Sequence, residues 1–242
     1  MIQRLLTYFL ITLFVCSCSN TYYYKKGLHN AANPTAASVY GNLNPITPDN
    51  NELIRDTING EPYILVVTWK SSDSFYINKD SLDPKTNLYR YNTQNWMVFV
   101  TAAPYLKEKH YSHLSDKKLT MRLNQLLGLP PISNYGYFVE MWVRPQDFFR
   151  PCYNNAITTN VCELTPTPKD SLNTGYLAWL NQYIEGSFNN ADVMKNYPFT
   201  HLGYTYDWCP RNKSHEGLSE FVIDKNKKVY IKKVYTTREY FQ

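Results

Sequence analysis

The sequence predicts an α+β domain with a mainly antiparallel or mixed sheet of five to six strands, two amphipathic helices and a C-terminal β-hairpin. Short apolar runs rich in β-branched and aromatic residues recur along the chain, and such runs are typical of buried strands. Only two segments show the period of an amphipathic helix, and they lie far apart. The alternation of strand and helix that builds a doubly wound sheet is therefore missing. We expect a single domain over residues 56–242 of the 242-residue chain.

Three strands are expected in the first part of this domain, at Tyr63–Trp69, Trp96–Ala102 and Gly136–Val143. The first two are apolar almost throughout, a pattern that also suits a buried helix, but they are short and rich in β-branched residues. Residues 71–94 between them are polar and rich in turn formers, so they predict a loop or an edge hairpin. The third strand contains one charged residue, Glu140, which we expect to pair with an arginine that follows the strand.

The first amphipathic helix is predicted to begin at the capping residue Ser115 and to end at Gly128, because two prolines shortly after it prevent continuation. Its apolar residues follow the i, i+4, i+7, i+8 spacing: Leu119, Leu123, Leu126 and Leu127. The second helix is predicted over Leu172–Glu185, with Asp170 or Ser171 as its cap. Its apolar face is expected to hold Leu172, Tyr176, Trp179, Leu180 and Tyr183.

The last part of the chain returns to strand patterns at His201–Trp208, Gly217–Ile223 and Lys228–Thr236. The turn-forming residues DKNK separate the last two runs, so they predict an antiparallel hairpin. Cys152 and Cys162 are expected to form a disulfide in an exported chain, because they close the shortest of three possible loops. In the chain-entropy model a ring of this size stabilises the fold by ~2.5–3 kcal/mol. Cys209 is then left unpaired.

The densest group of reactive side chains lies in one segment and contains His201, Asp207, Cys209, His215, Glu216 and Glu220. If this segment begins as a strand, His201 and Asp207 share a face but lie ~20 Å apart, at ~3.3 Å per residue. They form no dyad unless the strand bends. Cys209 with His215 is the other candidate pair, a thiol activated by an imidazole. Against it, Cys209 lacks the flanking sequence of known cysteine proteases, and a free thiol is readily oxidised outside the cytoplasm.

Other catalytic or metal-binding motifs are not found. His110 and His113 have a spacing that suits two ligands on one helical face, but no acidic third ligand follows and the zincin spacing is absent. We therefore expect no metal and no cofactor. The sequence also lacks the G-x-S-x-G elbow, the P-loop, the dinucleotide-binding glycines and the C-x-x-C-H haem motif.

The first residues have the pattern of a secretory signal. Arg4 is followed by an apolar run from Leu5 to Val15, which is shorter than the ~20 residues that a spanning helix needs. The motif Val15-Cys16-Ser17-Cys18 resembles the lipobox of bacterial lipoproteins, with small Ser17 just before the cysteine. This resemblance implies removal of residues 1–17 and acylation of Cys18, and Ser19 after it points to the outer membrane. An ordinary signal peptide with soluble export is the alternative.

Residues 18–55 are expected to be the lipidated cysteine followed by a flexible tether, because they are rich in Asn, Thr, Ala and Pro without a regular apolar period. The cluster Tyr22-Tyr23-Tyr24-Lys25-Lys26 suits either a membrane interface or a solvated linker. Removing Arg4 from the 25 Lys+Arg leaves a mature net charge of +4 against 20 Asp+Glu. This charge is spread along the chain, so we expect no nucleic-acid partner.

The chain contains 22 Tyr, 11 Phe and 5 Trp, more than core filling alone requires, and Tyr and Trp suit contact surfaces. We expect such surfaces at the Tyr-rich segments Asn87–Asn92 and Tyr204–Trp208. The leading hypothesis is a non-catalytic lipoprotein, periplasmic or surface-facing, that binds the bilayer through acylated Cys18 and contacts other envelope proteins, within a larger envelope or secretion assembly. One alternative is an envelope hydrolase that uses the 201–220 segment. The other is a glycan or peptidoglycan binder, with exposed coplanar rings flanked by Asn and Asp.

Overall fold

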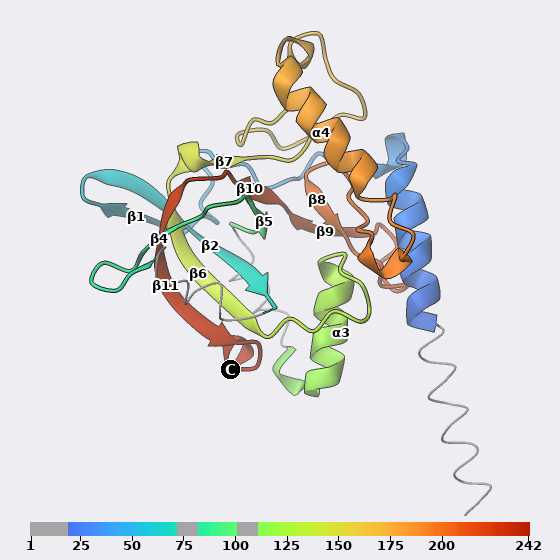
Figure 1. Ribbon diagram of the computed structural model, residues 1–242, viewed down its shortest axis with the longest axis horizontal. Helices are drawn as coiled ribbons and strands as arrows, with labels where there is room; N and C mark the ends of the chain where they lie inside the picture. Colours follow the sequence, from blue (N-terminus) through green and yellow to red (C-terminus); the bar gives the residue numbers. More distant parts are fainter. Residues whose placement is uncertain (1–18, 72–81, 101–110) are drawn as a thin grey trace, which may run out of the picture.

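A computed structural model describes residues 19–71, 82–100 and 111–242. Its largest element is a six-stranded sheet in which every pairing is antiparallel (Figure 1). The strands, in spatial order, are β1 (Arg55–Ile58), β2 (Glu61–Lys70), β6 (Tyr137–Val143), β11 (Lys228–Thr236), β4 (Leu88–Arg90) and β3 (Leu82–Asp83). The predicted α+β class is confirmed. The expected signal peptide and Cys18, and also His110, lie outside the described residues.

The first hairpin shows why this chain turns where it does. Strands β1 and β2 are joined by Asn59 and Gly60, which both have positive φ values, 53° and 82°. An Asn-Gly pair with this backbone forms a type I′ turn, whose twist matches that of the two strands. The Asn-Gly pair is therefore the local signal that places a strand before the first predicted one.

A second, three-stranded sheet packs against the first and consists of β5 (Asn95–Val98), β10 (Phe221–Ile223) and β7 (Phe148–Phe149). A bridge between Val67 and Phe99 connects the two sheets. One core lies between them, with buried residues from both sheets such as Val66, Met141 and Ile223. The predicted strands at Tyr63–Trp69 and Trp96–Ala102 are therefore strands, as far as the chain is described.

Helix α3 (Asp116–Leu126) covers the other face of the large sheet (Figure 1). Its four predicted leucines are buried against aromatic side chains of β2 and β6, including Trp69 and Phe138. Ser115 is the N-cap residue, and the chain leaves the helix through Gly128 at φ 70°, a conformation that glycine adopts without strain. This predicted helix is confirmed at both ends.

Helix α4 (Thr174–Gly186) lies in a lobe that projects beyond the sheets, and its aromatic residues contact Trp96 of β5 and Phe149 of β7 (Figure 1). Its cap is Asn173, whose side chain accepts a hydrogen bond from the N–H of Tyr176, and not Asp170 or Ser171. Those two residues form a short 3-10 helix with Leu172. The prediction that Leu172 belongs to the apolar face is wrong, because its side chain is 83% exposed. The other 3-10 helices of the described residues are Ala36–Ser38, Tyr111–His113, Pro145–Asp147, Val193–Lys195 and Glu239–Phe241.

The expected tether is not what the structure shows for residues 19–53. Residues 19–32 form a helix that packs on the short sheet of β8 (Tyr204–Tyr206) and β9 (Glu216–Ser219). Tyr24, Leu28 and Ala31 of this N-terminal helix are buried. Their i, i+4, i+7 spacing is that of a helical face, which the surrounding polar residues obscured. Further along, Leu43, Ile46 and Leu53 are also buried in the domain.

Two expectations about pairing differ from the structure. Glu140 pairs with Lys232 on the neighbouring strand at 3.0 Å, whereas Arg144 pairs with Asp147 and Arg150 is buried against backbone carbonyls. Strands β10 and β11 are joined by the expected turn, but β10 pairs with β5 and β7 while β11 pairs with β4 and β6. The local sequence therefore predicts the position of a turn but not which strands pair in the sheet.

The predicted disulfide between Cys152 and Cys162 is confirmed, and Cys209 is free. In the part of the chain that the structure covers, no helix is both long and apolar enough to cross a lipid bilayer.

Candidate functional site

The predicted reactive segment, residues 201–220, forms β8, β9 and their connection. It lies between the N-terminal helix on one side and α3 on the other (Figure 1). The candidate catalytic residues lie in this segment. The polar contacts of these residues therefore show whether they are arranged for catalysis or stabilise the fold.

Asp207 is a structural charge. Its side chain is 1% exposed and binds the guanidinium of Arg122 through two hydrogen bonds of 3.0 and 2.7 Å. The same carboxylate accepts from the backbone N–H of Cys209 and from the amide of Asn212, each at 3.0 Å. Burial alone lowers the pKa of Arg122, but its bonds and charge interaction with Asp207 raise that pKa above its ordinary value. A carboxylate with four donors around it has little capacity left to act as a base.

His215 is held by its neighbours in one orientation. Its Nδ1 lies 2.9 Å from the carbonyl oxygen of Asp207, and its ring stacks on Tyr206 with centroids 5.0 Å apart. Because a carbonyl only accepts, Nδ1 carries the proton and Nε2 is the acceptor of the neutral ring. The backbone of His215 has a φ of 60°, so the ring leaves the chain at a tight turn.

His201 lies outside β8, in a position with φ 45°, and is packed edge-on against the rings of Tyr153 and Phe199. Burial lowers its pKa to about 4, so it is neutral at physiological pH. The carboxylate of Asp207 is occupied by Arg122, Cys209 and Asn212, and none of these is a histidine. His201 and Asp207 therefore form no dyad, as expected from the sequence, and each has a structural role of its own.

Cys209 and His215 line different pockets. Cys209 lines an open groove of about 680 Å³ on the α3 side, together with His113, Arg122 and Glu216. His215 lines a smaller cavity on the side of the N-terminal helix. Burial raises the pKa of Glu216, and a hydrogen bond from Asn42 opposes that effect. The predicted pair of the Cys209 thiol and the His215 imidazole is therefore not assembled.

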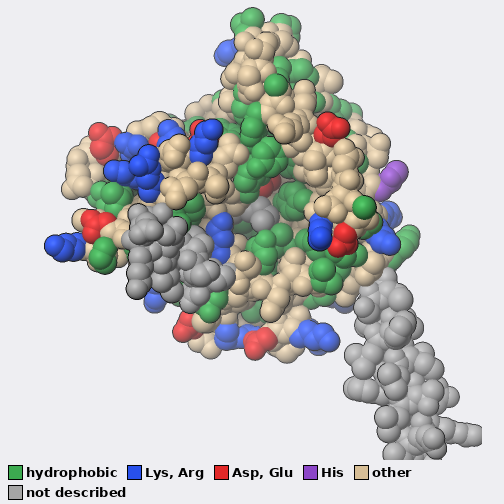
Figure 2. Space-filling model, viewed as in Figure 1, with side chains coloured by type: hydrophobic (Ala, Val, Ile, Leu, Met, Phe, Trp, Pro, Cys, Tyr) green, Lys and Arg blue, Asp and Glu red, His purple; other side chains and the backbone are tan. Residues whose placement is uncertain are grey.

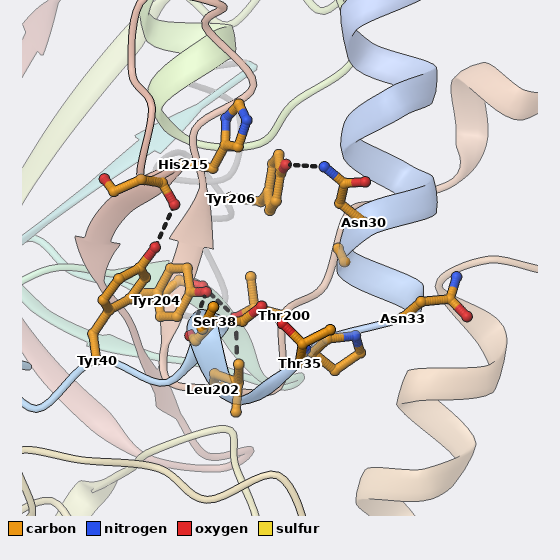
Figure 3. Close-up of a pocket in the computed structure, with 14 residues that line it drawn as sticks. Asn30, Asn33, Thr35, Ser38, Tyr40, Thr200, Leu202, Tyr204, Tyr206 and His215 are labelled. Carbon is orange, nitrogen blue, oxygen red and sulfur yellow. Dashed lines mark hydrogen bonds between the residues drawn. The ribbon is translucent and has the colours of Figure 1, made fainter.

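The smaller cavity, which we call the helix–hairpin cavity, has a volume of about 250 Å³. Its walls come from the end of the N-terminal helix, the following 3-10 helix and β8 (Figure 3). The hydroxyl of Tyr206 accepts from Asn30 Nδ2 at 2.9 Å, Tyr204 donates to the carbonyl of Ser38 at 2.9 Å, and Tyr40 donates to the connection before β9. These polar groups bond across the cavity to one another, so they join the helix to the hairpin.

No metal centre is assembled by the described ranges, where no three His, Cys, Asp or Glu side chains come together in a suitable arrangement. The expected contact surfaces are also placed differently. Tyr89, Tyr91, Tyr204 and Tyr206 are all buried, at 3–7% exposure. Aromatic rings instead reach the surface around α4, where Tyr183 is 39% exposed. The i, i+3, i+7 spacing of Tyr176, Trp179 and Tyr183 is the sequence signal for this surface, but the same spacing also predicts a core-facing helix.

Comparison with protein-family models, with curated proteins and with solved structures finds no match to this chain. Support for its function therefore comes from the N-terminal sequence motif and the geometry of the sites.

Proposed function

We propose that this protein is a lipid-anchored binding protein of the bacterial cell envelope, held at the outer membrane through acylated Cys18. One observation carries the proposal: the chain is helical from residue 19, directly after the proposed anchor, and this helix is part of the folded domain. The lipobox-like motif supports an anchor at Cys18, and an anchor there would be adjacent to a rigid element.

The N-terminal helix is fastened firmly to the domain. Tyr24 is fully buried, its hydroxyl donates to the carbonyl of Asn196 at 2.5 Å, and its ring meets Trp208 edge-on. A Cβ at Gly27 would lie only 3.1–3.2 Å from Tyr206 and Trp208, so the helix and the hairpin are in close contact. At ~1.5 Å per residue, Tyr24 lies ~7.5 Å along the helix axis from Ser19, the residue that follows the proposed anchor. The domain would then sit close to the bilayer in one orientation.

The outer face of the same helix suits a lipid headgroup region. Tyr22 is 62% exposed, and Lys25, Lys26 and His29 are exposed as well. Aromatic rings with a polar tip and cationic side chains are favoured at the membrane interface, particularly beside anionic lipids. With several acyl chains on Cys18, each buried CH₂ contributing ~0.8 kcal/mol, the anchor would be stable.

Binding is favoured over hydrolysis because the aspartate and the two histidines among the candidate catalytic residues already have structural partners. Asp207 is neutralised by Arg122, His201 is buried among rings, and His215 donates to a backbone carbonyl. A hydrolase would need at least one of them free and paired with a nucleophile.

The anchor is tested by fractionating cells that express Cys18→Ser or Cys16→Ser protein, with labelled palmitate to report acylation. Loss of Cys18 should abolish labelling and stall processing, because the thiol that receives the lipid is gone. Cys16→Ser is the matched control, two residues away in a tolerant position, and should label and fractionate like the natural protein. Processed Cys18→Ser protein that still sediments with the outer membrane would overturn the proposal.

A further inference from the structure

We infer that a cleft beside α4 is a glycan-binding site that takes one sugar ring with hydroxyl and acetamide substituents. We call it the α4 cleft and define it by Gln94, Phe149, Asn155, Tyr176, Trp179 and Asp224. The inference deepens the proposed function, because it names the ligand class of the anchored domain, but the cleft itself does not depend on the anchor.

The cleft lies where the α4 lobe meets the two sheets, and Figure 2 shows hydrophobic side chains gathered at the base of that lobe. Its volume is about 310 Å³, at the lower end of the range for small-molecule sites. A space of this size suits a single sugar ring whose neighbours along a glycan extend into solvent.

The aromatic wall is held rigidly. The ring of Trp179 meets Phe149 edge-on at 5.1 Å and Tyr176 in a tilted contact at 5.3 Å. On its other side Trp179 contacts Trp96 and Tyr183, with centroids 5.6 and 4.9 Å away. The hydroxyl of Tyr176 donates to the carbonyl of Cys152 at 2.8 Å, which ties α4 to the disulfide loop. A preorganised ring loses little entropy when an apolar ligand face stacks on it.

The polar wall has unused hydrogen-bonding capacity. In the described part of the chain, the side-chain amides of Gln146 and Asn155 have no hydrogen-bond partner, and neither does the indole N–H of Trp179. Asp224 accepts from Gln94 at 3.2 Å and keeps further acceptor capacity. Amides both donate and accept, which matches sugar hydroxyls and acetamide groups, and Trp adds one donor.

The charges of the cleft nearly cancel. Asp147 forms ion pairs with Arg144 at 2.9 Å and with Lys227 at 3.3 Å, so its carboxylate is neutralised at the cleft floor. Asp224 remains as the carboxylate on the rim. A ligand of strong net charge would gain little from this wall, whereas a polyhydroxylated ring with an apolar face uses both of its surfaces. These features favour a sugar over a charged peptide.

The test is a titration of the full-length lipoprotein, purified in detergent, with three probes: a chito-oligosaccharide, a cello-oligosaccharide and a peptidoglycan stem peptide without sugars. We expect the first to quench Trp fluorescence saturably. Trp179→Leu should weaken binding at least ~10-fold, because the aromatic ring that lines the cleft is lost, and Asn155→Ala by ~3–10-fold, because one hydrogen-bonding group is lost. Trp142→Leu is the matched control, the same substitution at a half-buried tryptophan of β6 that does not line the cleft, and should bind nearly as well as the natural protein.

The probes separate the sources of the sugar. Binding of the chito-oligosaccharide alone indicates an acetamido sugar such as those of peptidoglycan, and binding of both saccharides indicates a hydroxyl-directed site. If neither saccharide binds at millimolar concentration, if only the stem peptide binds, or if Asn155→Ala and Trp179→Leu bind undiminished, the assignment is wrong. None of these outcomes depends on acylation, so they are distinct from a failure of the anchor.

Discussion

The helix–hairpin cavity and the α4 cleft are built from similar side chains, tyrosines and amides, but the two regions use them in opposite ways. In the cavity, Asn30 donates a hydrogen bond to the hydroxyl of Tyr206, and the hydroxyl of Tyr204 donates to the carbonyl of Ser38. In the cleft, the side-chain amide of Asn155 has no hydrogen-bond partner among the described residues. Buried polar groups that are satisfied within the protein hold elements together, whereas accessible unsatisfied ones are available to a ligand. Whether the lining polar groups have hydrogen-bond partners within the protein therefore distinguishes a structural cavity from a binding cleft better than the types of lining residues do.

The largest expected effect concerns the ion pair of Asp207 and Arg122, which lies on the α3 side of the hairpin and, like the groups of the helix–hairpin cavity, is satisfied within the protein. Asp207→Ala should lower the free energy of unfolding by ~3–5 kcal/mol, because it leaves the guanidinium of Arg122 without its buried partner. Urea denaturation measures the change. Asp116→Ala is the matched control, since Asp116 is 85% exposed in its pair with Arg238, and it should lose less than ~1 kcal/mol. Equal losses in the two variants would contradict a special structural role for Asp207.

A second test uses the pH dependence of stability. The folded-state pKa of His201 is lowered by burial to about 4, against an unfolded value of ~6.5, so the unfolded chain binds the proton first as pH falls. The stabilising effect of neutral His201 is complete above pH ~6.5 and is lost between there and pH ~4, by ~2 kcal/mol at pH 5.

His201→Asn should remove this dependence, because Asn does not titrate and tolerates positive φ. Urea denaturation at pH 7.5 and pH 5 would measure it, with exposed His29→Gln as the control that should follow the natural protein. A His201→Asn variant that loses as much stability on acidification as the natural protein would show that His201 is not the group responsible.

The smallest expected effect addresses the comparison directly. Tyr206→Phe removes the hydroxyl that Asn30 binds at 2.9 Å and should cost ~1 kcal/mol of stability. Asn155→Ala, in the cleft, should change stability by less than ~0.5 kcal/mol, since its amide has no partner among the described residues to lose. Thermal unfolding of the two variants side by side gives the comparison. A larger loss for Asn155→Ala would mean that the cleft amide is structural after all.

The local features of this protein were largely determined by its sequence. The leucines of α3 repeat with a helical period and are followed by Gly128, and the apolar runs of β2 and β6 are buried as strands. These signals depend only on neighbours along the chain, because side-chain direction follows the period of the element. The disulfide between Cys152 and Cys162 belongs to the same group, since its two thiols lie 10 residues apart.

What the tertiary structure alone decided is which distant groups meet. Asp207 finds Arg122, 85 residues away in sequence, and this pairing changes a catalytic candidate into a structural charge. The hydroxyl of Tyr24 donates to the carbonyl of Asn196, 172 residues away. This contact helps to hold the N-terminal helix on the domain, in a segment that was expected to be a flexible tether. The α4 cleft combines residues from Gln94 to Lys227. No local period encodes such contacts, because they depend on how separate elements pack together, and that packing is settled only when the chain folds as a whole.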